Sequence, residues 1–337
     1  MTSDPRMSPA DPVPTRILGP GGQRAGAIGL GCMGMSWAYG EEGRDEAQST
    51  AVIHRALDLG VTLLDTSDMY GPFTNEELLG RALRGRREDV VLATKGGLVV
   101  GSATPGGDAH SAYGIDRVAT PEHLRGAIDA SLQRLQTDHV DLYQLHRVDP
   151  GVPLEDSWGA MAQMVTDGKT RAIGLSEVSV EELERAHAIH PVASVQSELS
   201  LWTRDAIDDG VVAWCAAHDA AFIPFSPLGR GFLTGAVTAA SFGDDDFRGK
   251  NPRFTPEAMQ ENLAIVDVVR EVAERLEATA AQVALAWVLA QGDHVIPIPG
   301  TRRVQRLEEN AGAARLVLDD AARAALDAIP APVGARY

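Results

Sequence analysis

Val61-Thr-Leu-Leu-Asp65-Thr-Ser-Asp-Met-Tyr70 is an apolar run that ends in a carboxylate and a phenol, before Gly71-Pro72 breaks it and a helical pattern follows. A β-strand that delivers two ionisable side chains to its exit is typical of a catalytic site. Two later runs end in the same way, Val90–Lys95 with a lysine and Val140–His146 with a histidine. One such residue alone is usually only solvated, but four at three strand exits indicate one shared site.

The same alternation of strand and helix covers the rest of the chain. Eight short apolar runs are separated by helical patterns: residues 27–31, 61–64, 90–94, 140–145, 172–176, 194–197, 221–225 and 294–298. The first five are apolar on both faces or nearly so, as strands covered by helices must be. Eight such strands predict an α/β fold, a parallel (β/α)8 TIM barrel, with its site at the C-terminal ends of the strands.

Helix ends are also legible. Thr120-Pro121 predicts an N-cap followed by a first helical residue, and Gly60 predicts the end of an earlier helix. Two connections, residues 96–119 and 228–256, are too long to be simple turns, and both follow strand exits. We therefore expect them to form lids over a bound substrate and cofactor.

The composition is that of an enzyme-sized globular protein. The 337 residues are 44% hydrophobic, and no apolar run approaches the roughly 18 residues of a membrane helix. The formal net charge of -17 disfavours nucleic acid and anionic membranes as partners. Only Cys32 and Cys215 are cysteines, which supports neither a disulfide framework nor a thiolate metal site and fits a reducing cytoplasm. Residues 1–14 predict a disordered tail, and residues 15–337 a single barrel domain.

Gly29-Leu-Gly31-Cys-Met-Gly34 matches the Gly-x-Gly-x-x-Gly fingerprint of Rossmann dinucleotide-binding folds. That fingerprint must open a helix whose N-terminus holds a pyrophosphate, yet no amphipathic helix begins here until near Asp45. We therefore expect a flexible loop that lets the backbone approach a ligand at the mouth of the barrel.

Taken in order, these motifs resemble the aldo-keto reductase superfamily. The resemblance rests on Gly29-Leu-Gly-Cys-Met-Gly-Met, Asp65-Thr-Ser-Asp-Met-Tyr70-Gly, Lys95 and Gln144-Leu-His146. It continues through Gly174-Leu-Ser-Glu-Val-Ser, Gln196, Phe225-Ser-Pro-Leu-Gly-Arg-Gly and Ile298-Pro-Gly-Thr-Arg302 to Asn310. It covers nearly the whole chain, and the most similar branch is that of bacterial and plant aldehyde reductases, including pyridoxal reductases.

The resemblance implies a catalytic tetrad of Asp65, Tyr70, Lys95 and His146, and reduction of aldehydes or ketones with Tyr70 as the proton donor. A tyrosine with an ordinary pKa of about 10 is a poor acid near neutrality. We expect Lys95, held by Asp65 as an ion pair, to lower that pKa. His146 would orient the carbonyl by a hydrogen bond, although a lone histidine is as often a core residue that satisfies backbone groups.

The resemblance also implies NADPH as the cofactor, with Ser176, Gln196 and Phe225 at the nicotinamide. Glu177 is a further expected contact, at a position where many relatives have Asn; a carboxylate can accept a hydrogen bond from the carboxamide NH2 but cannot donate one to its oxygen. Arg302 and Arg306 would bind the 2'-phosphate and favour NADPH over NADH, the alternative being an ordinary basic first turn of a helix. The other expected cofactor contacts are Gly31, Cys32, Met33, Asp65, Ser226, Pro227, Leu228, Gly229, Arg230, Gly300, Thr301, Glu309 and Asn310.

We predict that the substrate pocket is lined by Trp37, Tyr39, Arg147 and Trp202, which follow strand exits. Aromatic residues at such positions as often serve only in packing. No cluster of His, Asp and Glu has metal-ligand spacing, so we expect no metal. Two alternatives to the reductase stay open. One is an NADPH-binding accessory protein that resembles the potassium-channel β subunits and turns over little. The other is a barrel enzyme of different chemistry, such as an isomerase or a lyase.

Overall fold

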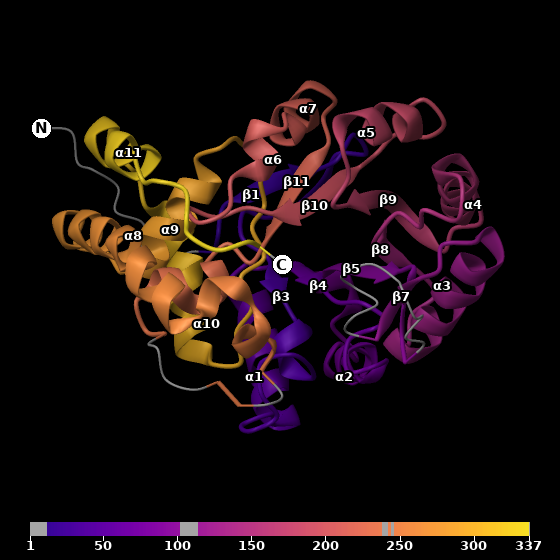
Figure 1. Cartoon of the computed structure of the whole chain (residues 1–337). Helices are drawn as coiled ribbons and strands as arrows, with labels where there is room; N and C mark the ends of the chain where they lie inside the picture. Colours follow the sequence, from indigo (N-terminus) through magenta and orange to yellow (C-terminus); the bar gives the residue numbers. More distant parts are fainter. Residues whose placement is uncertain (1–11, 102–113, 238–241, 244–245, 337) are drawn as a thin grey trace, which may run out of the picture.

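Parallel strands form a ring in the computed structural model, which describes residues 12–101, 114–237, 242–243 and 246–336. Seven strands of the described residues are neighbours in the order β11, β10, β9, β8, β5, β4, β3, as Figure 1 shows. Their bounds are β3 Leu30–Gly31, β4 Leu63–Asp65, β5 Val91–Gly96, β8 Val140–Leu145, β9 Thr170–Ser176, β10 Ser194–Glu198 and β11 Ala221–Phe225.

The eighth apolar run, residues 294–298, closes the ring between β11 and β3. The N–H of Ile296 donates to the carbonyl oxygen of Phe222 (2.8 Å), and the N–H of Gly29 donates to that of Pro297 (2.9 Å). Pro297 has no N–H of its own, so the hydrogen-bond ladder is interrupted and the run is not a regular strand. The predicted barrel is therefore confirmed, with its eighth strand reduced to a few bridging bonds.

Helices lie around the outside of the ring (Figure 1). Thr120 accepts a hydrogen bond from the N–H of His123 at the start of α3, and Gly60 follows α1 with a φ of 80°, so both predicted helix ends are confirmed. The bounds are α1 Glu46–Asp58, α2 Thr74–Ala82, α3 Pro121–Leu135, α4 Leu154–Thr166, α5 Val180–His187, α6 Asp205–Asp208, α7 Val211–Ala217, α8 Pro256–Arg275, α9 Ala280–Leu289, α10 Val304–Gly312 and α11 Asp320–Asp327.

An antiparallel hairpin that the sequence analysis did not predict covers the N-terminal end of the barrel. It consists of β1 (Thr15–Leu18) and β2 (Gln23–Gly26). Arg16 on β1 donates to the carbonyl oxygens of Gly292 (2.8 Å) and Leu289 (3.1 Å), just before the eighth run. Leu18 and Ala25 pack against the inward-facing apolar residues Leu63, Val91, Ala93, Leu142, Ala221, Ile223, Ile296 and Ile298. The hairpin therefore shuts the barrel at this end.

Both long connections carry structure of their own. Residues 96–119 contain the hairpin β6 (Leu98–Val100) and β7 (Ile115–Arg117), and residues 102–113 of this predicted lid lie outside the described residues. Residues 228–256 contain the 3-10 helices η4 (Gly229–Thr234), η5 (Phe247–Lys250) and η6 (Pro252–Phe254).

Residues 1–11 of the predicted N-terminal tail (residues 1–14) lie outside the described residues. At its end, Val13 is buried, and its N–H donates to the carbonyl oxygen of Leu59 (2.8 Å). None of the described helices combines the length and the hydropathy that a membrane crossing requires.

Candidate functional site

Asp65, Tyr70, Lys95 and His146 come together at the C-terminal end of the barrel. Asp65 is the last residue of β4, Lys95 lies near the end of β5, and His146 directly follows β8. The Nζ of Lys95 donates to Oδ1 of Asp65 (2.6 Å) and to Oη of Tyr70 (3.2 Å). The rings of Tyr70 and His146 meet edge to face, with centroids 5.9 Å apart. The four side chains that the sequence analysis grouped are therefore adjacent.

The pair of Lys95 and Asp65 is buried, with exposed fractions of 0% and 3%. Burial disfavours the ammonium, but Asp65 and Tyr70 outweigh that effect, so the pKa of Lys95 is raised. Burial also raises the pKa of Tyr70, and the charge of Lys95 offsets this only in part. The net direction for Tyr70 is opposite to the one expected from the sequence, because the phenol loses more solvation than one cation restores.

The second carboxylate oxygen of Asp65 is held by two amide side chains. Gln196 on β10 donates from Nε2 to Oδ2 of Asp65 (2.8 Å), and Gln144 on β8 donates to the same oxygen (3.4 Å). Gln144 was part of the quoted motif but had no predicted role. Both oxygens of Asp65 thus have donors, which fixes the carboxylate against the lysine.

A cavity of about 770 Å³ opens beside these residues, and Asp65, Tyr70 and His146 lie in its wall. Both long connections contribute to the wall, one through Leu98 and Ile115 and the other through Leu228, Arg230, Gly231, Phe247, Arg248 and Asn251. The predicted cofactor and substrate residues in the wall are Gly31, Met33, Trp37, Tyr39, Arg147, Ser176, Gln196, Phe225, Ser226, Pro227, Leu228, Arg230, Gly300, Thr301 and Arg302. The described parts of the two predicted lids therefore border one cavity.

Other predicted contacts are not in the cavity wall: Cys32, Glu177, Trp202, Gly229, Arg306, Glu309 and Asn310. Trp202 packs against Phe232 in the core, with ring centroids 4.1 Å apart, and so gives the cavity no surface. Arg306 forms an ion pair with Glu309 (2.6 Å) on α10. Cys32 is fully buried, and its N–H donates to the carbonyl oxygen of Asp65 (2.9 Å).

Guanidinium groups gather at the rim of the cavity. Arg44, Arg248 and Arg302 are in its wall, and only Arg302 was predicted. The pKa of Arg302 is lowered, first by burial and then by the positive charges of Arg44, Arg303 and Arg248. Arg302 also donates to the carbonyl oxygen of Tyr39 (3.2 Å). Arg248 pairs with Asp246 (2.6 Å) and Arg44 with Glu41 (3.5 Å), which balances part of this positive charge. A bound anion would balance more of it, and arginine suits phosphate in particular.

Comparisons with known proteins agree with this geometry. The aldo/keto reductase family model matches residues 27–331. The chain belongs to the aldo/keto reductase family. Its structure is similar to the glycerol dehydrogenase AKR11B4 from Gluconobacter oxydans, with 29% identity, coverage of 96% of this chain and 95% of that chain, and a TM-score of 0.82.

An aldo-keto reductase from Klebsiella pneumoniae, solved in complex with NADPH, is 27% identical over 96% of this chain and 98% of that chain, with a TM-score of 0.72. The aldo-keto reductase AKR11C1 from Bacillus halodurans is 24% identical, with 96% and 98% of the two chains covered and a TM-score of 0.73, and shares the fold.

Glu177 adopts a left-handed φ of 54°. Its Oε1 accepts from the N–H of Glu198 (2.9 Å) and from Nη2 of Arg336 (2.6 Å), and Arg336 also donates to Glu198 (3.0 Å). Figure 1 shows the C-terminal segment running from α11 towards the ring of strands. The charge of Glu177 is therefore balanced by a residue far away in sequence, which no local pattern could reveal.

The glycine motif of this aldo/keto reductase opens no long helix: a single 3-10 turn, η1 (Met33–Met35), precedes α1. The rejection of the Rossmann fingerprint is therefore confirmed. A Cβ on Gly29 would lie 2.9 Å from the carbonyl oxygen of Leu63, and one on Gly31 would lie 2.8 Å from that of Ile298. These glycines permit close strand packing, so the expected flexible loop is wrong for them, although Gly31 does lie in the cavity wall as expected for a backbone that approaches a ligand.

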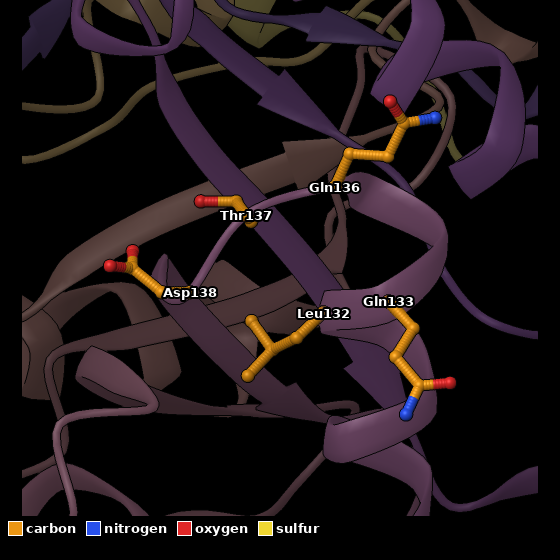
Figure 2. A pocket seen from close by; sticks show the side chains of 5 residues that line it. All are labelled: Leu132, Gln133, Gln136, Thr137 and Asp138. Carbon is orange, nitrogen blue, oxygen red and sulfur yellow. The ribbon is translucent and has the colours of Figure 1, made fainter.

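A shallow depression elsewhere is lined by Leu132, Gln133, Gln136, Thr137 and Asp138 (Figure 2). These residues form the end of α3 and the turn before β8, at the opposite end of the barrel from the tetrad. Within the described residues, no group of three or more His, Cys, Asp and Glu side chains could hold a metal ion.

Proposed function

We propose that the chain is an NADPH-dependent reductase that converts aldehydes or ketones to alcohols and catalyses the reverse oxidation at the same site. The observation that carries the proposal is the contact between Oη of Tyr70 and Nζ of Lys95 (3.2 Å) beside a cavity of about 770 Å³. Family membership supports it, as does the similar reductase solved with NADPH. We further propose that residues 15–337 act as one barrel domain in the cytoplasm.

The residues around the cavity fit NADPH, because guanidinium groups lie at its rim and amide and hydroxyl groups lie beside the tetrad. Arg302, with Arg44 and Arg248, would hold phosphate groups, which favours NADPH over NADH. Ser176 and Gln196 would hold the nicotinamide amide. When bound, NADPH supplies the hydride for the carbonyl carbon.

Tyr70 gives its phenol proton to the carbonyl oxygen in reduction and takes a proton from the alcohol in oxidation. The ammonium of Lys95 stabilises the phenolate that remains, and Asp65 holds this ammonium in place at 2.6 Å. His146 orients the oxygen that reacts. The apolar residues Met69 and Leu98 pack with Tyr70 and limit water at the reacting atoms.

Tyr70→Phe tests this proposal, with NADPH absorbance followed against aromatic, aliphatic and pyridoxal-type aldehydes and, in reverse, against small alcohols such as glycerol. We expect kcat/KM to fall by about 10²–10⁴-fold in the variant, because the proton donor is lost while the ring remains. Fluorescence titration should give the same NADPH affinity for both proteins.

Two other outcomes would decide against a reductase. Tight NADPH binding without turnover of any carbonyl by the wild type would indicate an accessory protein. A wild type that does not bind NADPH would indicate a barrel enzyme of different chemistry.

A further inference from the structure

Ser67 and Asp68 lie next to the tetrad and have no part in the mechanism above. The Oγ of Ser67 lies 3.1 Å from Nδ1 of His146 and 3.2 Å from Oδ1 of Asp68. The N–H of Met69 donates to the same Oγ (3.3 Å), and the carbonyl oxygen of Lys95 lies 3.4 Å away. All three side chains are buried, with exposed fractions of 0% for Ser67, 5% for Asp68 and 7% for His146. One hydroxyl proton therefore has several competing acceptors.

We propose that Ser67 and Asp68 are positioning residues that determine which ring nitrogen of His146 carries the proton. When Asp68 is neutral, its O–H donates to Ser67, the hydroxyl of Ser67 donates to Nδ1, and Nε2 carries the ring proton. When Asp68 is ionised, Ser67 donates to the carboxylate, Nδ1–H donates to Ser67, and Nε2 keeps a lone pair. Asp68, Ser67 and His146 thus form a proton relay. When Asp68 ionises, its proton passes to Ser67, the hydroxyl proton of Ser67 passes to Nδ1, and the Nε2 proton leaves to the cavity, so one proton is lost overall.

The two arrangements suit opposite directions of the reaction. This role of the relay in catalysis rests on the proposed function. A carbonyl oxygen only accepts hydrogen bonds, so it needs Nε2–H from His146. An alcohol can donate its O–H to a lone pair on Nε2. The relay of Asp68 and Ser67 thus prepares His146 for a carbonyl at low pH and for an alcohol at high pH.

Charged groups on α2 and α3 allow Asp68 to titrate in a useful range. Burial, followed by the carboxylate of Glu76, raises the pKa of Asp68 to about 7, while Ser67 and Arg134 act in the other direction. Glu76 is itself fixed, because it accepts from Thr94 (2.6 Å) and from Arg134 (2.7 Å). Asp68 therefore exchanges its proton near neutrality.

The strands beside Asp68 contribute groups that keep one charge state. Tyr143 on β8 is fully buried, which raises its pKa well above the usual value and leaves a neutral phenol. On β5, the carbonyl oxygen of Lys95 accepts from the N–H of Asp68 (3.2 Å), and the pKa of the Lys95 ammonium is raised. An Asp68 carboxylate with a His146 imidazolium would hold as many protons as the neutral pair, but two buried charges are costly to desolvate.

Nitrogen-15 NMR of the full chain, labelled in its histidine side chains and free of added cofactor, reads the tautomer without any turnover. The chain has 9 histidines, and the signals lost in His146→Gln identify those of His146. From about pH 5.5 to about pH 8.5, we expect the wild type to change from the Nε2–H to the Nδ1–H form. In Asp68→Asn the amide donates to Ser67 and keeps the Nε2–H form throughout. A wild-type tautomer that does not change, or the same change in Ser67→Ala, would overturn the proposal.

Kinetics separate a relay from a merely structural role. Ser67→Ala should lower kcat/KM for reduction by about tenfold, the equivalent of one hydrogen bond, with NADPH affinity unchanged. Ser67→Thr keeps the hydroxyl and should restore the pH dependence of the ratio between reduction and oxidation. Equal loss of that dependence in both variants contradicts the relay. A tautomer that changes in a protein that reduces no carbonyl would leave the relay intact and refute the proposed function.

Discussion

Asp68 is a buried carboxyl whose proton affinity depends on folding. Its pKa rises from 3.8 to about 7, by burial and by the charge of Glu76. Between these pH values the folded state binds more protons than the unfolded state, so the free energy of unfolding falls as the pH rises through this window. Asp68→Asn removes this charge. We expect the substitution to raise the free energy of unfolding by roughly 4 kcal/mol more at pH 8 than at pH 4.

Urea unfolding followed by tryptophan fluorescence at the two pH values measures this difference. Asp209→Asn is the matched control, because Asp209 is exposed at the end of α6 and its substitution removes the same charge from the surface. If Asp68→Asn had the same effect at both pH values, Asp68 would have no raised pKa in the folded protein.

At the residue scale, sequence could predict that these side chains share a site, because Asp65, Lys95 and His146 lie at or just after strand ends and Tyr70 lies in the turn that follows β4. The apolar runs place Asp65, Lys95 and His146 at strand exits once parallel strands are assumed, while their roles are implied by the family resemblance. The hydrogen bond between Ser67 and His146 could not be predicted, because it depends on side-chain distances across the barrel. The raised pKa of Tyr70 was missed for a similar reason, since burial is a property of the folded protein.

A glycine-to-alanine substitution is expected to have opposite effects on stability in helices α2 and α3. A Cβ on Gly80 of α2 would lie 2.3 Å from the carbonyl oxygen of Arg134 on α3, whereas one on Gly126 of α3 would meet nothing within 4 Å. Gly80→Ala should therefore separate the helices and lower the free energy of unfolding by about 1–3 kcal/mol. Gly126→Ala should raise it by up to about 1 kcal/mol, because alanine is the better helix former. Thermal unfolding of both variants measures the two signs, and a shared sign would contradict the close approach.

At the element scale, the helices and the inner strands could be predicted because their signals are local. Thr120 and Gly60 mark helix ends by their own chemistry, and the core faces repeat at helical spacing. The β1–β2 hairpin was missed, because its strands have four residues each and are fixed by Arg16 and Leu18 against distant parts of the chain. The irregular eighth strand depends on Pro297, whose position within an apolar run did not exclude a strand.

At the scale of the whole molecule, the two ends of the barrel have different tasks. The β1–β2 hairpin shuts the N-terminal end, while the cavity opens at the other. Segments far apart in sequence meet over this cavity: Tyr39 and Asp246 form an antiparallel bridge, and the rings of Tyr39 and Phe247 lie 5.0 Å apart. Within the described residues, the cavity beside the tetrad therefore opens on the side where the long connections meet.

The barrel closes where the first apolar run (residues 27–31) lies beside the eighth (residues 294–298), and Gly29 lies at this junction. A Cβ there would lie 2.9 Å from the Leu63 carbonyl oxygen and 2.9 Å from Cγ2 of Ile298, so Gly29→Ala should force the neighbouring strands apart. We expect it to lower the free energy of unfolding by about 1–3 kcal/mol, measured as a lower midpoint of thermal unfolding. Gly21→Ala is the control, because a Cβ on Gly21 in the β1–β2 turn meets nothing within 4 Å. Equal midpoints for the two variants would mean that the junction yields to a methyl group, and that the close contact of the first and eighth runs does not stabilise the closed barrel.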